Sequence, residues 1–437
     1  MSLVAVLNSR PDVKALLEKA LVQDRNDEFL LHQASNVEEA LEILSFDLPE
    51  IVIWNATDPE LDSAPVLESL LSDSWMHNFG IIAIYDSREA RDTEVSRQLA
   101  AINVLTVLSY DKLKDSLYKH LRIIDANRQI LVHLEVGEED GARTTGSFNI
   151  DNDPMVVPVY TGLAAQLLVQ RGRLLPNSKR DLQIALSELV QNGIEHGNCG
   201  LTATEKAEFL SNGGNISDLI SEKIALDPAL GSKKVTLEWE IRPEDTRFFV
   251  RDQGNGFDVA AFQQRIKSLG TEALSGRGIK LAKSLGGKLS YNRTGNVACL
   301  TVIHSQSSER KTPRGFEGEQ VLIAKKGDIV FRQGELSDHI FYITSGQFGV
   351  YHDGVEVGRL SPADVFMGEM SFLMNNMRTA TVICENPGRI IKIARRSFVK
   401  TLRLYPQYGL FLAKLMARKL SAGNQVRARQ VLDESMT

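Results

Sequence analysis

Apolar and polar positions follow three different patterns along the chain. Over residues 1–125, short apolar runs that suit buried parallel strands alternate with amphipathic helical stretches, the runs being LVAVL, EIVIW and GIIAIY. Residues 146–306 combine helical patterns with strand pairs, and residues 316–437 place glycines at turns between short strands before a helical stretch over 396–420. We therefore predict a multidomain chain with a doubly wound α/β domain, an α+β domain and a β-roll with C-terminal helices.

Two segments with few apolar residues separate these regions. Residues 126–145 begin as a helical stretch and continue into EVGEEDGARTTGS, which is rich in acidic residues and glycine. We predict a helical linker there, either exposed to solvent or paired with its copy in a dimer. Residues 307–315, SSERKTPRG, are charged and contain turn-forming residues, so they are predicted to be a second linker.

Composition narrows the class of protein. The 437 residues contain 43% hydrophobic and 24% charged residues, values typical of a soluble globular protein. The net charge of −6 gives no electrostatic reason to expect nucleic-acid binding. Cys199, Cys299 and Cys384 are scattered and fit no metal-ligand spacing, which indicates a reduced intracellular protein. Because no apolar run approaches the roughly 20 residues of a membrane span, we expect a cytoplasmic protein without a membrane partner.

The alternation in residues 1–125 resembles the receiver domain of bacterial response regulators. A receiver uses a carboxylate cluster to hold Mg²⁺ and to accept a phosphoryl group, but Asn8 and Ser9 stand at the acidic pair and Asn55 at the acceptor position. An amide is a poor nucleophile and brings no charge to a divalent cation. We therefore predict a pseudo-receiver that serves as a docking or dimerisation module. Asp58 and Asp62 nearby are interpreted as solvated loop acids.

The string SELVQNGIEHGN carries the first candidate chemistry of the middle region. Glu188, Asn192 and His196 recur every four positions, so on a regular helix they share one face. The amide oxygen of Asn192 suits Mg²⁺, and Glu188, one turn earlier, suits a group that orients or deprotonates an attacking hydroxyl. Taken alone, the string fits a solvated helix face better than a ligand site.

Two further strings add glycine turns to this region. RDQGNGFD follows a strand pattern; Asp252 ends the strand, and Gly254 and Gly256 let the backbone approach a ligand closely. SGRGIKLAKSL places Gly276 and Gly278 directly before an amphipathic helix, whose N-terminal N–H groups suit phosphate.

The three strings in this order resemble the ATP-binding motifs of the GHKL superfamily, and most closely those of the anti-sigma-factor serine kinases. The resemblance implies an α/β sandwich that binds ATP and Mg²⁺ through these motifs, His196 included, with the metal on Asn192. It also implies that Asp252 accepts a hydrogen bond from the adenine amino group and that Glu188 is the catalytic base. The implied activity is that of a protein serine kinase, and the implied partner is an anti-sigma-factor antagonist or a sigma-factor-like protein.

Two alternatives to the serine kinase stay open. A sensor histidine kinase would carry a phospho-accepting histidine before its ATP domain, but His120 and His133 lack the expected acidic and proline context and are interpreted as surface residues. A non-catalytic switch protein would bind ATP only to shape a docking surface for its partner.

The string GEMSFLMNNMRTATV carries the candidate chemistry of the C-terminal region. Gly368 and Glu369 open a short helix, and the planar guanidinium of Arg378 suits a cyclic phosphate. Nearly the whole region resembles the cyclic-nucleotide-binding domain, which implies that Glu369 accepts from the ribose 2′-hydroxyl and that Thr379 reaches phosphate or guanine. Both cAMP and cGMP remain open as ligands. We expect a homodimeric bacterial signalling protein in which the cyclic nucleotide shifts the terminal helices and regulates the kinase domain.

Overall fold

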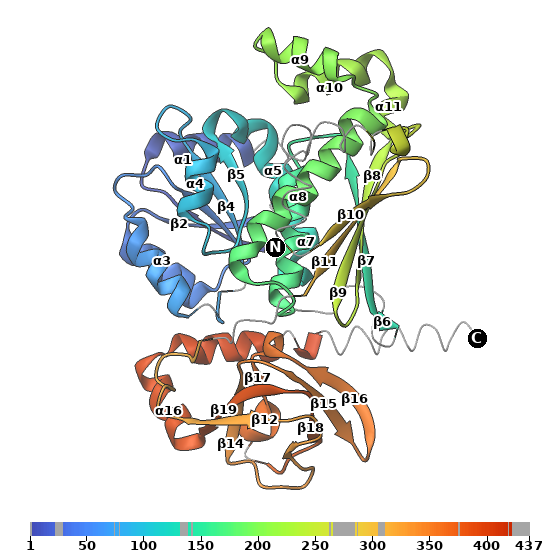
Figure 1. Cartoon of the computed structure of the whole chain (residues 1–437). Coiled ribbons are helices and arrows are strands. Elements are labelled where there is room, and N and C mark those ends of the chain that lie inside the picture. Colours follow the sequence, from blue (N-terminus) through green and yellow to red (C-terminus); the bar gives the residue numbers. More distant parts are fainter. Residues whose placement is uncertain are drawn as a thin grey trace, which may run out of the picture.

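The computed structural model describes residues 2–21, 29–73, 75–77, 79–131, 139–140, 143–261, 264, 285, 287–304, 311–374, 376–417 and 419–421. Figure 1 shows two modules packed side by side above a third, which holds the C-terminal β-sheets. Among the described residues, no helix combines the length and the apolar character that crossing a membrane requires.

The N-terminal module is built on a parallel sheet with helices on both faces (Figure 1). Its five strands lie in the order β2-β1-β3-β4-β5, and β3 is buried along its whole length, as its continuous apolar sequence predicts. The elements are β1 (Ser2–Leu7), α1 (Pro11–Leu21), β2 (Phe29–Ala34), α2 (Val37–Glu42), β3 (Ile51–Asn55), α3 (Ser63–Ser72), β4 (Gly80–Tyr85), α4 (Asp92–Gln98), β5 (Val104–Ser109), α5 (Leu113–Ala126) and α6 (Arg128–Leu131).

The middle module is an antiparallel sheet with strand order β10-β11-β9-β8-β7-β6. Alternate residues of β8 are buried, which is the pattern of a sheet covered on one face, and α7 and α8 pack on that face (Figure 1). The elements are β6 (Glu139–Asp140), β7 (Arg143–Asp151), α7 (Val157–Gln170), α8 (Lys179–Asn192), α9 (Ala203–Ser211), α10 (Ile216–Leu226), α11 (Pro228–Ser232), β8 (Lys234–Ile241), β9 (Asp245–Arg251), β10 (Lys288–Tyr291) and β11 (Val297–Ile303). A π-helical turn, Gly193–Asn198, continues α8.

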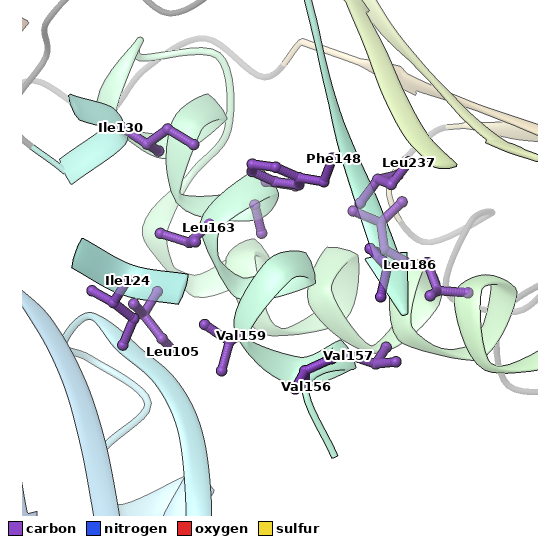
Figure 2. Close-up of a cluster of buried hydrophobic side chains, with 14 of the residues drawn as sticks. Leu105, Ile124, Ile130, Phe148, Val156, Val157, Val159, Leu163, Leu186 and Leu237 are labelled. Atoms are coloured by element: carbon purple, nitrogen blue, oxygen red, sulfur yellow. The ribbon is translucent and has the colours of Figure 1, made fainter. Parts of the chain in front are cut away.

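These two modules share one hydrophobic core. Figure 2 shows Leu105 of β5 and Ile124 of α5 beside Val159 and Leu163 of α7. The contact is close because α7 presents Gly162 to the edge strand: a Cβ at this position would lie 2.8 Å from the carbonyl oxygen of Leu105. The edge of the parallel sheet is therefore covered by the middle module.

The predicted linker over residues 126–145 is only partly correct. Ile130 and Leu131 of α6 are buried in the shared core, and the side-chain amide of Gln170 donates a 2.9 Å hydrogen bond to the carbonyl of Leu131. At its far end, β7 already begins at Arg143. Burial of two large apolar side chains stabilises the packed position by about 3–6 kcal/mol relative to an exposed connector.

The C-terminal module is a β-roll of two four-stranded antiparallel sheets, β12-β19-β14-β17 and β13-β18-β15-β16. Its elements are β12 (Gln320–Ala324), β13 (Ile329–Phe331), β14 (His339–Ile343), β15 (Gln347–His352), β16 (Val355–Leu360), β17 (Phe366–Met367), α15 (Glu369–Leu373), β18 (Thr381–Asn386), β19 (Gly388–Ala394) and α16 (Arg395–Leu404). A further helix, over 407–417 and 419–421, is called the C-terminal helix below. It lies between the β-roll and the upper modules (Figure 1).

Candidate nucleotide sites

The first motif spans the end of α8 and the π turn that follows. Glu188 is half-buried on α8, and Asn192 is the exposed last residue of that helix. His196 lies in the wider π turn, where its Nδ1 is 2.6 Å from the carbonyl oxygen of Leu201. The regular helical spacing that relates Glu188 to Asn192 ends at Gly193, and His196 belongs to the wider turn that follows.

The second motif meets the first at Asp252. This residue follows β9, and its carboxylate accepts a 2.9 Å hydrogen bond from the backbone N–H of Gly254. Gly197 leaves room for the carboxylate, since a Cβ there would lie 2.4 Å from the Asp252 carboxyl carbon. Gly254 in turn touches Gly197, whose carbonyl oxygen would be 2.1 Å from an added Cβ. Two strings more than fifty residues apart are thus in backbone contact.

Gly256 holds the rest of this turn in place. Its φ of 74° lies in the left-handed region, and a Cβ would lie 1.9 Å from the carbonyl oxygen of Thr294. Both the conformation and the contact therefore require glycine. The turn is fixed against the loop between β10 and β11, where the N–H of Phe257 also donates to Thr294 at 3.0 Å.

Asn198 joins the two motifs from the other side. Its side-chain oxygen accepts a 2.7 Å bond from the N–H of Gln253, and its amide donates to the side chain of Asn152 at 2.9 Å. Asn198 is fully buried, so these bonds replace contacts with water. Our reasoning from the sequence did not single out this residue. The available signal in the sequence was its position at the end of the string EHGN. The residues that it bonds, Asn152 and Gln253, lie far away in the chain.

Burial sets the electrostatics of the site. Burial raises the pKa of Asp252, whereas the hydrogen bond from the N–H of Gly254 acts to lower it. On β10, burial raises the pKa of Tyr291, and the negative charge of Glu188 raises it further. The charge of Glu188 on α8 therefore acts on Tyr291 of the edge strand β10.

An ion pair with a buried carboxylate ties the inserted helices to the first motif. Glu195 lies in the π turn with its side chain 5% exposed, and its carboxylate is 2.6 Å from Nζ of Lys206 on α9. The pair links the nucleotide motif to the α9–α11 insertion.

The third motif cannot be compared in the same way, because Gly276 and Gly278 lie outside the described residues.

The candidate site in the β-roll is a compact cluster around the start of α15. Gly368 has a φ of 75°, and a Cβ there would lie 2.2 Å from an Nη of Arg378. Arg378 is 4% exposed; that nitrogen donates to the carbonyl of Gly368 at 2.8 Å, and the guanidinium lies 4.3 Å from the centre of the Phe331 ring. The predicted residues Gly368, Glu369 and Arg378 are therefore gathered in one place. Thr379 is exposed, and its carbonyl oxygen lies 2.8 Å from Nδ1 of His352.

The receiver-like cluster in the N-terminal module is a hydrogen-bond network centred on two asparagines and a tyrosine. The side-chain amide of Asn55 donates to the side-chain oxygen of Asn8 at 2.7 Å, and the hydroxyl of Tyr110 donates to the side-chain oxygen of Asn55 at 2.7 Å. The interpretation of Asp58 as solvated was wrong: it is 7% exposed and accepts bonds from the N–H and the hydroxyl of Ser9. The exposed Asp62 caps α3 instead.

His120 is not the surface residue that its sequence context indicated. It is fully buried between α5 and the middle module, with Nε2 2.8 Å from the carbonyl oxygen of Met155. Apolar neighbours at the shared core account for this position, which the local sequence does not reveal. His133 lies outside the described residues.

Comparison with known families identifies two of the three modules. A family model described as histidine kinase-like ATPase domain matches residues 153–303, and a model for the cyclic nucleotide-binding domain matches residues 322–405. The chain therefore contains an ATPase domain of the histidine kinase-like type and a cyclic nucleotide-binding domain. The two matches support binding of ATP and of a cyclic nucleotide.

Individual relatives match the C-terminal part. A cGMP-dependent protein kinase from Plasmodium berghei is 34% identical over 84 residues, which are 19% of this chain and 10% of that protein. The chain thus spans about a tenth of this relative's length. The catabolite activator protein of Thermus thermophilus is 23% identical with a TM-score of 0.25, over 28% of this chain and 58% of that one. A cyclic nucleotide-binding domain from Methylobacillus flagellatus is 18% identical with a TM-score of 0.24, over 26% and 67%.

Proposed function

We propose that this protein is an ATP-dependent protein serine kinase of the anti-sigma type whose activity is regulated by a cyclic nucleotide. One observation carries the kinase proposal: Asp252 and its glycine turn pack against the end of the helix that presents Glu188 and Asn192. Gly197 and Gly254 keep Cβ atoms away from this contact, and the carboxylate of Asp252 is held in place by the N–H of Gly254. These features suit a narrow site into which a nucleotide base can reach.

Each residue has a proposed role. Asp252 accepts a hydrogen bond from the adenine amino group, and Asn192 would hold Mg²⁺ through its amide oxygen. Glu188, one helical turn before Asn192, takes the proton from the attacking serine hydroxyl. His196, Gly256, Gly276 and Gly278 complete the predicted nucleotide-binding set. When bound, Mg²⁺ would neutralise charge on the transferring phosphoryl group.

In the cyclic nucleotide-binding domain, we assign Arg378 to the cyclic phosphate, Glu369 to the ribose hydroxyl, and Gly368 and Thr379 to the surrounding contacts. The side chains of Glu369 and Arg378 are both buried and belong to one short segment, as recognition of a small polar ligand requires. Calorimetric titration of the full chain with cAMP and with cGMP would identify the ligand. A homodimer and an anti-sigma-factor antagonist as substrate remain parts of this proposal.

The experiment for the kinase uses the full chain, radiolabelled ATP with Mg²⁺ and a candidate serine-bearing anti-sigma-factor antagonist. We expect transfer to serine, and Glu188→Gln should slow it by at least about a hundredfold while ATP still binds. Glu222→Gln, which changes an exposed glutamate on α10, is the matched control and should transfer at the wild-type rate.

Two outcomes would replace this proposal. Tight ATP binding without transfer in the wild-type chain would favour the non-catalytic switch protein. Acid-labile phosphorylation of the chain itself would favour a histidine kinase. The position of His120 argues against the latter, because a fully buried imidazole next to the carbonyl of Met155 cannot receive a phosphoryl group without local unfolding.

A further inference from the structure

The C-terminal helix is anchored to the N-terminal module along one side. The hydroxyl of Tyr408 donates a 2.6 Å hydrogen bond to the carboxylate of Asp73. Two turns later, Nζ of Lys414 lies 3.0 Å from the carboxylate of Glu50 and also bonds the carbonyl of Leu48. A single helix of the C-terminal module therefore carries polar contacts to two different loops of the N-terminal module.

Trp75 adds an apolar anchor beside these bonds. Its ring centre lies 4.7 Å from that of Tyr408 and 5.0 Å from that of Phe411, both on the C-terminal helix, and 5.9 Å from that of Phe366 in the β-roll. Trp75 is only 3% exposed, so the N-terminal module inserts a complete aromatic side chain into the core of the other domain. Contacts of this kind are the largest single contributors to interface stability.

The far end of the same helix reaches the candidate cyclic-nucleotide site. Nζ of Lys419 lies 2.8 Å from a carboxylate oxygen of Glu369, whose side chain is 9% exposed. The charge of Lys419 also acts on Asp364, opposing the rise in pKa that burial imposes on that carboxyl group. Lys419 thus interacts with two acidic residues, Glu369 at the start of α15 and Asp364.

The second key side chain of the site is also engaged within the protein. Arg378 donates to the carbonyl of Gly368, to the hydroxyl of Ser371 at 3.2 Å and to the carbonyl of His339. Both charged groups proposed to hold the ligand, the carboxylate of Glu369 and the guanidinium of Arg378, therefore already have partners. A ligand has to exchange these contacts for its own.

We propose that Lys419 is an internal competitor of the cyclic nucleotide, and that ligand binding releases the C-terminal helix from the N-terminal module. This inference rests on the proposed function, because it takes Glu369 as the group that receives the ribose. A ligand that takes Glu369 breaks the ion pair and frees the end of the helix. The C-terminal helix also carries the anchors Tyr408, Phe411 and Lys414, so its displacement weakens docking around Trp75.

Competition of this kind is reciprocal. The free energy spent to separate Lys419 from Glu369 reduces the affinity for the ligand, and the ligand reduces the stability of the docked helix by the same amount. Loss of the lysine should therefore tighten ligand binding. A ligand site that used the lysine as a contact would show the opposite change.

The test is calorimetric titration of the full chain with cAMP and with cGMP. Lys419→Met keeps most of the side-chain volume but removes the charge, and we expect it to bind the ligand about tenfold more tightly than wild type, equivalent to about 1.4 kcal/mol. Lys400→Met, which changes an exposed lysine of α16, is the matched control and should bind as wild type.

The possible outcomes distinguish the proposed competition by Lys419 from the proposed cyclic-nucleotide site. Binding with equal or lower affinity in Lys419→Met than in wild type would refute the competitor while leaving the cyclic-nucleotide site intact. Binding to none of the three proteins would refute the site itself and the competitor with it. Hydrogen exchange supplies the second measurement: a saturating ligand should speed exchange over 407–417, and unchanged exchange there in a protein that binds would overturn the release of the helix.

Discussion

The hydroxyl of Tyr408 donates a 2.6 Å hydrogen bond to the carboxylate of Asp73, although 335 positions separate the two residues in the chain. Both groups are buried, and burial together with the neighbouring carboxylate raises the pKa of Tyr408. The phenol therefore stays protonated as a donor. The bond connects the C-terminal module directly to the N-terminal module.

We predict a coupling energy of about 2 kcal/mol between these two residues, since hydrogen bonds to charged groups contribute about 1.5–3 kcal/mol. The measurement is a double-mutant cycle with Tyr408→Phe and Asp73→Asn, followed by urea unfolding. Tyr351→Phe, which removes a longer bond of 3.3 Å to Glu385, should change stability by less. Additive effects of the two substitutions would show that the bond does not stabilise the interface.

Gly254→Ala should abolish ATP binding. The added methyl group would lie 2.1 Å from the carbonyl oxygen of Gly197, and neither backbone can move without separating the first motif from the second. We expect at least a hundredfold loss of ATP affinity in a calorimetric titration, equivalent to about 2.7 kcal/mol.

The matched control is Gly318→Ala, because an added Cβ there would meet nothing within 4 Å. This variant should bind ATP as wild type does. Wild-type affinity in Gly254→Ala would instead mean that the turn does not form part of the nucleotide site.

Local sequence predicted much of the fold because the relevant signals are short-range. Continuous apolar runs predicted β3 and β4 as buried parallel strands, and glycines at turns predicted the β-roll. Motif order predicted that Asp252 would approach the helix of Asn192, and the contact of Gly254 with Gly197 agrees with this.

The sequence did not predict the burial of residues whose contact partners are distant in the chain. Ile130 and Leu131 looked like parts of a linker because their partners on α7 lie about forty residues further along the chain. His120 and Asp58 looked exposed for the same reason. The π turn that contains His196 was not predicted, because a single-residue widening of a helix has no simple sequence signal.

Asn55→Asp should destabilise the N-terminal module. The side-chain amide of Asn55 is 1% exposed and donates to the oxygen of Asn8, so a carboxylate in its place would face another acceptor without water. We expect a loss of about 3 kcal/mol at pH 7.5, measured by urea unfolding, because a buried charge is costly and only the oxygen that faces Tyr110 and Thr57 would keep donors.

Asn36→Asp is the matched control. Asn36 is an exposed N-cap residue whose side-chain oxygen accepts from the N–H of Glu39, and aspartate preserves that bond. Its stability should stay within about 0.5 kcal/mol of wild type. If Asn55→Asp were equally mild, the network would have to tolerate a charge, and the pseudo-receiver interpretation would lose its physical basis.

Acidification should destabilise the interface between the N-terminal module and the ATPase domain through His120. Burial lowers the pKa of His120 to about 4, from an ordinary value of 6.5. In the unfolded chain the imidazole of His120 is protonated near pH 6.5, but in the folded chain only near pH 4. The stability of the folded chain therefore falls as the pH drops from about 6.5 to about 4, and the contribution of His120 is constant above this range. The difference in pKa corresponds to at most about 3 kcal/mol.

His120→Gln isolates this contribution, because glutamine can still donate to the carbonyl of Met155 but does not titrate. Urea unfolding of both proteins at pH 7.5 and pH 5 should show that wild type loses about 2 kcal/mol more than the variant, while other titrating groups cancel in the comparison. Parallel losses in the two proteins would show that His120 is protonated as easily in the folded chain as in the unfolded one. In that case the imidazole would have to reach water, in conflict with its complete burial between α5 and Met155.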